Sequence, residues 1–164
     1  MGKDNKGFSL VELIVVILIM AIIAVALAPQ VMKWVENSRL AKDVDTRNTM
    51  REQCEMALAD KEAFETVKES NYTITMTKTG DSDEVFVYTQ DGTTPITPDP
   101  DTDAYWANLL KVTGVSSFDD FEDKFTLKSN AGDGTIVLKV IVYSGGNTIA
   151  SITGLTGNDD ITID

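Results

Sequence analysis

The sequence predicts an α+β fold in which a long N-terminal helix packs, through its second half, on an antiparallel β-sheet. Residues 8–69 have apolar side chains at helical spacing, first as one continuous apolar run and then at steps of three and four. After Ser70, apolar and polar residues alternate in short stretches that end at turn residues, as in β-hairpins. The 164 residues suffice for one domain and a membrane anchor.

The apolar run from Phe8 to Leu27 predicts a transmembrane helix. Its 20 residues span about 30 Å as a helix, which is the thickness of one bilayer core. Glu12 is its only charged residue, and a carboxylate at the bilayer centre costs roughly 2.5–3.5 kcal/mol, less near an end. Two interpretations stay open. Either Glu12 reaches the membrane surface of a simple anchor, or it pairs with the α-amino group of a second copy, exposed by cleavage before Phe8.

A charged leader precedes the apolar run. A secretory signal is cut after its apolar run, whereas the predicted cleavage point here lies before it, between Gly7 and Phe8, so the helix stays on the mature chain. Lys3 and Lys6 favour a cytoplasmic leader. The predicted organisation is a leader peptide at 1–7, a transmembrane or filament-core helix at 8–29, and a globular head at 30–164 that includes the amphipathic half of the helix.

Pro29 ends the apolar segment and predicts a kink near the membrane surface, because it lacks a backbone donor and crowds the preceding turn. From Gln30 to about Glu69 the pattern predicts one amphipathic helix with a buried stripe. The predicted stripe consists of Val31, Trp34, Val35, Ala41, Val44, Cys54, Ala57, Leu58, Phe64 and Val67. We interpret Cys54 as a small core residue rather than a reactive thiol. It is the only cysteine, which excludes an intrachain disulfide.

Short strands make up most of the predicted head after Ser70. The predicted strands are Tyr72–Lys78, Glu84–Thr89, Lys124–Lys128, Thr135–Ser144, Thr148–Thr153 and an edge strand at Ile161–Ile163. The first and second form one hairpin, and the fourth and fifth form another. Between the hairpins, Gln90–Asp103 holds three of the four prolines and predicts an exposed loop.

A short helix, Ala104–Lys111, is predicted after this loop. Thr102 or Asp103 caps its start, and Gly114 ends it. The buried side of this helix is predicted to consist of Tyr105, Leu109 and Leu110. A further helical turn, leading into the strand at Lys124–Lys128, is indicated by Phe118, Phe121 and Phe125.

The net charge of −12 is unevenly placed. From Asp81 to Asp123, eleven acidic residues stand against Lys111 alone. Such a surface repels phosphates, so no nucleic-acid partner is predicted, and we interpret it as a solvated face. The lack of histidine excludes imidazole catalysis and histidine-ligated metals. Without a nucleophile–base pair or a phosphate-binding glycine motif, neither an enzyme activity nor a cofactor is predicted.

One acidic pattern matches the first half of a calcium loop, at Asp99, Asp101 and Asp103. An EF-hand loop needs glycine at its sixth position and glutamate at its twelfth, where this chain has Ala104 and Leu110. We therefore expect no EF-hand site and favour a solvated loop with a helix cap. A weaker calcium site in this loop, or near Asp159 and Asp160, is the alternative.

The N-terminal segment resembles the start of bacterial type IV pilins and of the pseudopilins of type II secretion and competence systems. The matching features are Lys6-Gly7, then Phe8, then Glu12 at the fifth place after the cut, and an apolar run that ends in Pro29. Their combination is highly specific. The resemblance covers about the first 35 residues, and the layout of a long helix followed by an antiparallel sheet agrees with a pilin-like fold.

This resemblance implies that a prepilin peptidase cuts between Gly7 and Phe8 and methylates the new amine of Phe8. The mature subunit would wait in the cytoplasmic membrane with its N-terminus inside. It would then enter a helical homopolymer or mixed pilus at the cell surface, through an inner-membrane assembly platform. Within the filament, Glu12 would pair with the Phe8 amine of a neighbour, and Pro29 would mark where the helix kinks or loosens.

Three functions follow as hypotheses. The leading one is a structural subunit of a type IV pilus or pilus-like filament, polymerised through its N-terminal helix. The second is a pseudopilin of a type II secretion or competence system. The third is a single-pass anchored domain that presents its acidic loops to a ligand.

Overall fold

The chain forms two units that are each compact, and the boundary between them falls inside the first helix. The computed structural model describes residues 9–68, 71–80, 82–129, 134–143 and 148–154. The first unit ends at Ser38 and the second begins at Arg39. Below, helix residues 10–38 are called the stalk and the second unit is called the head, and each is described by itself. The predicted boundary between Pro29 and Gln30 stays a prediction.

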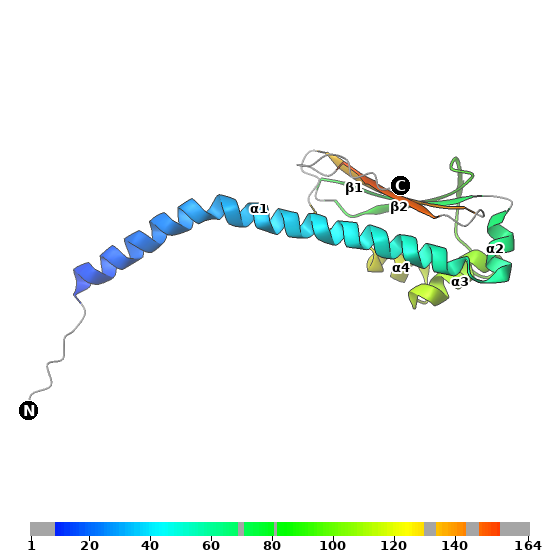
Figure 1. Ribbon diagram of the computed structural model, residues 1–164, viewed down its shortest axis with the longest axis horizontal. Coiled ribbons are helices and arrows are strands. Elements are labelled where there is room, and N and C mark those ends of the chain that lie inside the picture. Colours follow the sequence, from blue (N-terminus) through cyan, green and yellow to red (C-terminus); the bar gives the residue numbers. More distant parts are fainter. Residues whose placement is uncertain (1–8, 69–70, 81, 130–133, 144–147, 155–164) are drawn as a thin grey trace, which may run out of the picture. The chain divides into compact units, whose positions relative to one another are not determined.

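Helix α1 spans Leu10–Ala57 and passes through Pro29 without ending. It is the blue-to-cyan helix in Figure 1. Every stalk residue from Leu10 to Val35 is exposed in a single copy. An interior proline removes one helical hydrogen bond at a cost of about 3 kcal/mol, which a long helix tolerates. The kink predicted at Pro29 stays a prediction.

Within the head, α1 is buried along one face. Its buried residues are spaced by four, three, four and three, and they are Asp43, Arg47, Met50, Cys54 and Ala57. This spacing keeps them on one side of a helix. The predicted stripe was right for Cys54 and Ala57, but four of its members are exposed in one copy: Val31, Trp34, Val35 and Ala41. Val31, Trp34 and Val35 belong to the stalk, whereas Ala41 belongs to the head and lies between the partly buried Leu40 and the buried Asp43.

The predicted single helix to Glu69 is interrupted after Ala57, and a second helix, α2, spans Lys61–Lys68. Asp60 caps α2, since its Oδ1 accepts hydrogen bonds from the backbone nitrogens of Glu62 at 2.9 Å and Ala63 at 3.2 Å. A helix that starts afresh need not keep the phase of the preceding one.

The new start decides which side of α2 is buried. Ala63 and Val67 are fully buried, whereas Phe64 is only half-buried. The interpretation of Phe64 as a core residue was therefore wrong, because it assumed one unbroken helical phase from Gln30 onward.

Five antiparallel strands form a single sheet in the order β3-β2-β1-β4-β5. The strands are β1 Tyr72–Thr79, β2 Val85–Gln90, β3 Thr94–Ile96, β4 Thr135–Val142 and β5 Ile149–Thr153. Both predicted hairpins are confirmed: β1 pairs with β2, and β4 pairs with β5. Ser144 and the predicted edge strand Ile161–Ile163 lie outside the described residues.

Strand β3 lies in the stretch that was predicted to be an irregular loop. It pairs with β2 at the edge of the sheet, with Pro95 opposite Thr89. A proline has no backbone N–H to give to a neighbouring strand, so it fits at an edge, where one side needs no partner. The prediction of an irregular loop was wrong at Thr94–Ile96, because it was based on the proline-rich composition of the whole stretch.

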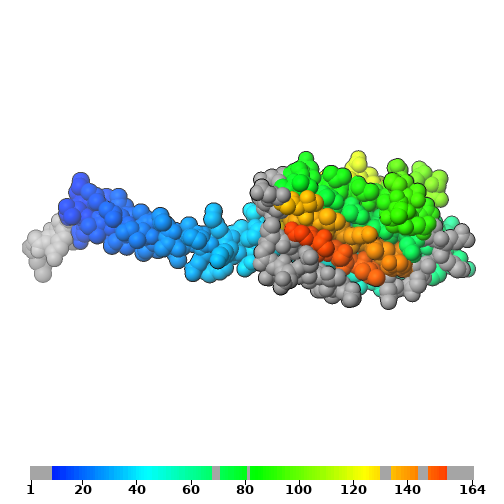
Figure 2. All heavy atoms as spheres, turned by 90° about the horizontal axis from the view of Figure 1, so that it is seen from above, coloured from blue at the N-terminus to red at the C-terminus, as the bar shows by residue number. Residues whose placement is uncertain are grey.

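One face of the sheet carries the core. Buried side chains of β1 and β4, Ile74, Met76, Ile136, Leu138 and Val140, form one cluster with Met50 and Cys54 of α1. In Figure 1 the strands form a layer with α1, α3 and α4 on one side of it. Figure 2 shows the opposite face, on which the green to red strands are not covered by a helix. The predicted α+β fold, with a long helix packed on an antiparallel sheet, is confirmed and is pilin-like.

Two short helices complete the head as predicted. Helix α3 spans Ala104–Thr113, is capped by Asp103 and ends at Gly114 in the left-handed conformation. Helix α4 spans Phe118–Lys124 and is capped by Ser117. The buried side of α3 includes the expected Tyr105, Leu109 and Leu110, and also Trp106.

Aromatic rings fill the space between these helices and the sheet. Trp106 stacks on Tyr72 with ring centroids 4.9 Å apart and meets the edge of Tyr88 at 5.7 Å. Phe121 of α4 continues the cluster to Phe125 at 4.9 Å. Such offset and edge-on contacts add to the hydrophobic effect of burial.

The strand predicted at Lys124–Lys128 does not form. Lys124 ends α4, and the residues after it have no strand partner. Instead, side chains bond the backbone: Glu84 Oε1 accepts from Leu127 N at 3.0 Å, and Lys78 Nζ donates to Leu127 O at 2.8 Å. The prediction of a strand was wrong here, because side chains take the place of a neighbouring strand as partners of this backbone.

Candidate functional site

The start of the stalk carries the residues predicted to matter for processing and assembly. Gly7 and Phe8 lie outside the described residues. Ser9 precedes the first helical residue, and its backbone nitrogen donates to Glu12 Oε2 at 3.4 Å. A glutamate three residues after the cap position commonly reaches back in this way, as one half of a capping box. Glu12 is thus placed at the helix start, exposed, with a weak bond inside its own copy.

From Leu13 to Leu27 the stalk presents an apolar surface. Its large exposed side chains include Leu10, Val11, Leu13, Ile17, Leu18, Ile22 and Val25. Over the described residues, α1 is the helix that is long and apolar enough to cross a membrane, and its apolar window is wholly exposed. In water such a surface is unstable, so it needs lipid or other apolar helices around it.

A buried carboxylate joins the first turn of the head to a segment 85 residues later. Asp43 is fully buried and accepts hydrogen bonds from Lys128 N at 2.5 Å, from Ser129 N at 3.0 Å and from the Ser129 hydroxyl. Three donors satisfy a charge that would otherwise be costly to bury. We call this set the Asp43 clasp. Sequence reasoning missed it, because a charged residue on an amphipathic helix reads as solvent-facing.

Arg47 lies one turn after Asp43 on the same buried face. It is 3% exposed, and its Nε and Nη2 donate to Asn48 Oδ1 at 3.2 and 2.8 Å. Burial lowers the pKa of the Arg47 guanidinium, and the charge of Arg51 lowers it further. A possible signal in the sequence was the spacing itself, since Asp43 and Arg47 continue the steps of the buried Met50 and Cys54.

Cys54 is the small core residue that the sequence predicted. It is fully buried, and burial raises the pKa of its thiol to about 12, while the adjacent Tyr105 hydroxyl lowers that pKa by a smaller amount. The thiolate is the reactive form of cysteine, so this thiol is inert at neutral pH.

The aspartates of the suggested calcium loop have other partners in the structure. Asp99 Oδ1 accepts from Asp101 N at 3.0 Å. Asp103 caps α3 through Oδ1 and accepts from the Tyr72 hydroxyl at 2.5 Å through Oδ2. Among the described residues, no three acidic or cysteine side chains are grouped to hold a metal ion. Asp159 and Asp160 lie outside the described residues.

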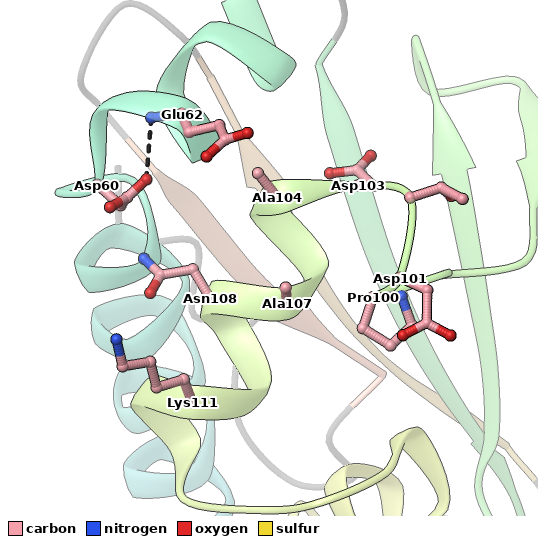
Figure 3. Close-up of a pocket in the computed structure, with 10 residues that line it drawn as sticks. Asp60, Glu62, Pro100, Asp101, Asp103, Ala104, Ala107, Asn108 and Lys111 are labelled. Atoms are coloured by element: carbon pink, nitrogen blue, oxygen red, sulfur yellow. Dashed lines mark hydrogen bonds between the residues drawn. The ribbon is translucent and has the colours of Figure 1, made fainter.

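An open hollow of about 380 Å³ lies between α2, the loop before α3, and α3 itself. Figure 3 shows Asp60 and Glu62 on one side, Asp101 and Asp103 on another, and Lys111 at the far end. Asp60 and Asp103 are helix caps, so their carboxylates are already bonded to backbone nitrogens. The hollow is an acidic surface feature that attracts cations, without the enclosed donors of a catalytic site.

Two buried tyrosines of the head, Tyr72 and Tyr88, donate hydrogen bonds to carboxylates. The Tyr88 hydroxyl donates to Glu122 Oε1 at 2.9 Å. Burial, followed by the hydrogen bond to its carboxylate partner, raises the pKa of Tyr72 beside Asp103 and of Tyr88 beside Glu122. Both phenols therefore stay protonated donors, which is a structural role.

Comparison with known protein families gives one match. Residues 2–28 match the prokaryotic N-terminal methylation motif. No curated protein and no solved structure matches the chain. The match contains the predicted cleavage point, Glu12 and the whole apolar run, and it supports the resemblance drawn from those residues. Residues 2–28 thus carry the prepilin-type signal of type IV pilins and pseudopilins.

Proposed function

We propose that this chain is a structural subunit of a type IV pilus or pilus-like filament. A prepilin peptidase processes it, and its N-terminal helix mediates polymerisation. The observation that carries the proposal is the methylation motif at residues 2–28, placed at the start of an apolar helix. The head, by contrast, has the packed core of a structural domain.

The exposed stalk supports this proposal physically. In one copy, every residue from Leu10 to Val35 is exposed. Lipid covers such a helix before assembly, and the stalks of neighbouring copies cover it in a filament. Both environments remove apolar surface from water, so exchanging one for the other costs little, and the stored subunit remains ready to polymerise.

Glu12 is the group that we expect to select the partner. Its weak bond to Ser9 N leaves its charge largely uncompensated by the described residues of its own copy. The free amine of Phe8, created by cleavage after Gly7, is a cation of the right charge in a neighbouring copy. A buried ion pair stabilises only when both partners are present, so pairing fixes how far one stalk is shifted along the next.

Cleavage is the first test of this proposal. We expect coexpression with a prepilin peptidase to yield a chain that lacks residues 1–7 and carries one methyl group, seen by intact-mass analysis. Gly7→Leu should abolish cleavage, and Gly2→Leu, in the same leader, should not. A wild-type chain that keeps its full mass contradicts the proposal.

Filament length separates the pilus from the pseudopilin hypothesis. Electron microscopy of cells that express the chain should show long surface filaments for a pilus subunit and none for a pseudopilin of a short secretion piston. Glu12→Gln should remove the filaments while the head stays folded. If surface assembly is unchanged in Glu12→Gln, the anchored ligand-binding domain becomes the better explanation.

A further inference from the structure

The stalk contains an uncharged stretch with a charged side chain at each end. Glu12 precedes it and Lys33 follows it, so residues 13–32 are 20 residues without a charge. A helix of that length spans about 30 Å, the thickness of one bilayer core. The apolar run at residues 8–27 has the same length but begins five residues earlier and encloses Glu12. The two placements of the helix in a bilayer differ by about 7.5 Å.

Four exposed residues lie where the uncharged stretch ends. They are Met32, Lys33, Trp34 and Val35, and Trp34 is 67% exposed. Successive residues of an α-helix point about 100° apart, so four in a row surround the helix. We call them the collar. Among the described residues, none forms an ion pair with Lys33.

The side chains of the collar have the chemistry of a membrane–water interface. Tryptophan combines a large apolar ring with one N–H donor and is enriched at that interface. Lysine buries its apolar stem and keeps its ammonium group in water. Met32 and Val35 add apolar surface on the remaining sides of α1. A ring of this composition fits the headgroup layer better than either water or the acyl chains.

The cost of buried polar groups favours residues 13–32 as the part of α1 in the bilayer core. This placement takes the Glu12 carboxylate out of the core, where a charge is costly. It brings in the amide of Gln30, which is uncharged and lies third from the end of the stretch, so its cost is smaller. Pro29 crowds the carbonyl of Val25, and Val25 lies in the core in both placements, so Pro29 does not distinguish them.

We propose that the collar binds the lipid headgroup layer while the subunit is stored in the membrane. Residues 13–32 then fill the bilayer core, and Glu12 lies in the opposite headgroup layer. The proposal rests on the membrane storage that belongs to the filament function proposed above. Lipid phosphates are the anions that complement Lys33, and the collar continues directly from the apolar surface that needs lipid. The collar thus sets the depth of the helix in the bilayer.

Fluorescence quenching by brominated lipids tests the position of the collar. The full, uncleaved chain is placed in vesicles of phosphatidylcholine and phosphatidylglycerol with bromine either near the headgroups or near the ends of the acyl chains. In Trp106→Phe, which keeps Trp34 as its one tryptophan, bromine near the headgroups should quench more strongly. In the control Trp34→Phe, neither lipid should quench, because Trp106 is buried in the head. A Trp34 signal that neither lipid quenches, or that deep bromine quenches more, overturns the proposal.

A second pair of variants locates the centre of the bilayer along the stalk. Ile22 lies at the middle of residues 13–32, and Ile17 lies at the middle of residues 8–27. Ile17→Trp and Ile22→Trp are made in a chain whose own two tryptophans are replaced by phenylalanine. Both sites are exposed on the stalk, so neither variant disturbs the head. Bromine near the chain ends should quench Ile22→Trp more than Ile17→Trp, and equal or reversed quenching contradicts the proposed depth.

Charge reversal tests the contact of Lys33 with lipid phosphates. Lys33→Glu should reduce the quenching of Trp34 by bromine near the headgroups, because a carboxylate is repelled by the anionic surface. Asn37→Glu is the matched control, since Asn37 is exposed one turn beyond the collar, and it should reduce the quenching less. High salt should shrink the effect of Lys33→Glu. Equal quenching in Lys33→Glu and the unsubstituted stalk contradicts the phosphate contact.

These measurements and the test of the filament function fail separately. Quenching is measured on the uncleaved chain, so it does not depend on a prepilin peptidase. A chain that keeps its full mass in the cleavage experiment contradicts the filament function and leaves the collar in place. Trp34 found in water, in a chain that is cleaved and methylated, overturns the collar and leaves the filament function standing.

Discussion

The stalk and the head differ in how their apolar side chains are kept from water. Both contain apolar side chains at helical spacing, but the stalk exposes every residue from Leu10 to Val35, whereas the head encloses a core that includes fully buried Met50, Trp106 and Phe121. The stability of the head is therefore contained within one copy. The stalk depends on what surrounds it.

Their carboxylates differ in the same way. Asp43 in the head is fully buried and accepts three hydrogen bonds from its own chain. Glu12 in the stalk is exposed and accepts one long bond, from Ser9 N. A carboxylate in an apolar environment needs hydrogen-bond donors or an opposite charge. Asp43 has such donors within its own fold, whereas we propose that Glu12 finds its partner on another copy.

The largest effect is expected for the core of the head. Phe121→Ala should lower the free energy of unfolding by about 3–5 kcal/mol, because Phe121 is fully buried among other rings. Phe64→Ala, at a half-buried site, should cost clearly less. Urea unfolding of the full chain in detergent, followed by tryptophan fluorescence, measures both. Equal losses would mean that the helical phase of α2 is wrong.

Removal of the Asp43 carboxylate should have the next largest effect. Asp43→Ala leaves the Lys128 and Ser129 nitrogens and the Ser129 hydroxyl without an acceptor. The two Ser129 donors are buried, and at about 1–3 kcal/mol for each buried unsatisfied group we expect a loss of roughly 2 kcal/mol or more. Asp45→Ala, an exposed neighbour on α1, should change stability by less than about 0.5 kcal/mol. Urea unfolding followed by tryptophan fluorescence measures both variants. Similar losses of unfolding free energy in Asp43→Ala and Asp45→Ala would argue against the clasp.

Alkaline pH should weaken the head by an intermediate amount. The pKa of Cys54 is raised to about 12, and the pKa values of Tyr72, Tyr88 and Tyr105 are raised as well. A raised pKa means that the unfolded chain loses its proton first, so this stability is present below the unfolded pKa and falls as pH rises past it. Each pH unit above 9 should cost about 1.4 kcal/mol for the fully buried Cys54 thiol, and each unit above 10 should cost less than that for Tyr72, because solvent screens its charge. A urea midpoint that does not fall between pH 8 and pH 10.5 would contradict this.

The smallest effect is expected in the stalk. Leu18→Ala should change the unfolding free energy of the head by less than about 0.5 kcal/mol, because Leu18 is 57% exposed and lies outside the head. The same variant should still weaken filament assembly, which filament yield from cells would show. A large loss of head stability would mean that the two units are not independent in energy.

The sequence predicted the elements whose signals are local. Both hairpins follow from alternation within each strand, and α3 follows from Asp103 and Gly114 at its two ends. The N-terminal segment was recognised because its residues are neighbours in the chain, and residues 2–28 match the N-terminal methylation motif. Local rules suffice wherever the partners lie within a few residues of each other.

The elements that escaped prediction depend on distant partners. Leu127 has its backbone bonded by Lys78 and Glu84, more than forty residues away, so no local pattern indicates it. The Asp43 clasp spans a still longer gap, 85 residues of the chain. The break before α2 was missed for another reason: Asp60 is a cap, and a cap inside a helical pattern was read as a solvent-facing charge.

The Asp43 clasp has a mechanical consequence if copies are pulled along α1, as subunits of a filament under tension are. The clasp fixes the segment around Ser129 to the first turn of α1 in the head, and Lys78 and Glu84 tie Leu127 of the same segment to the β1–β2 hairpin. Load that enters the head through the helix thus reaches the middle of the sheet within a few bonds. The helix therefore cannot leave the head without breaking the hydrogen bonds of the Asp43 clasp as well as its own contacts with the core.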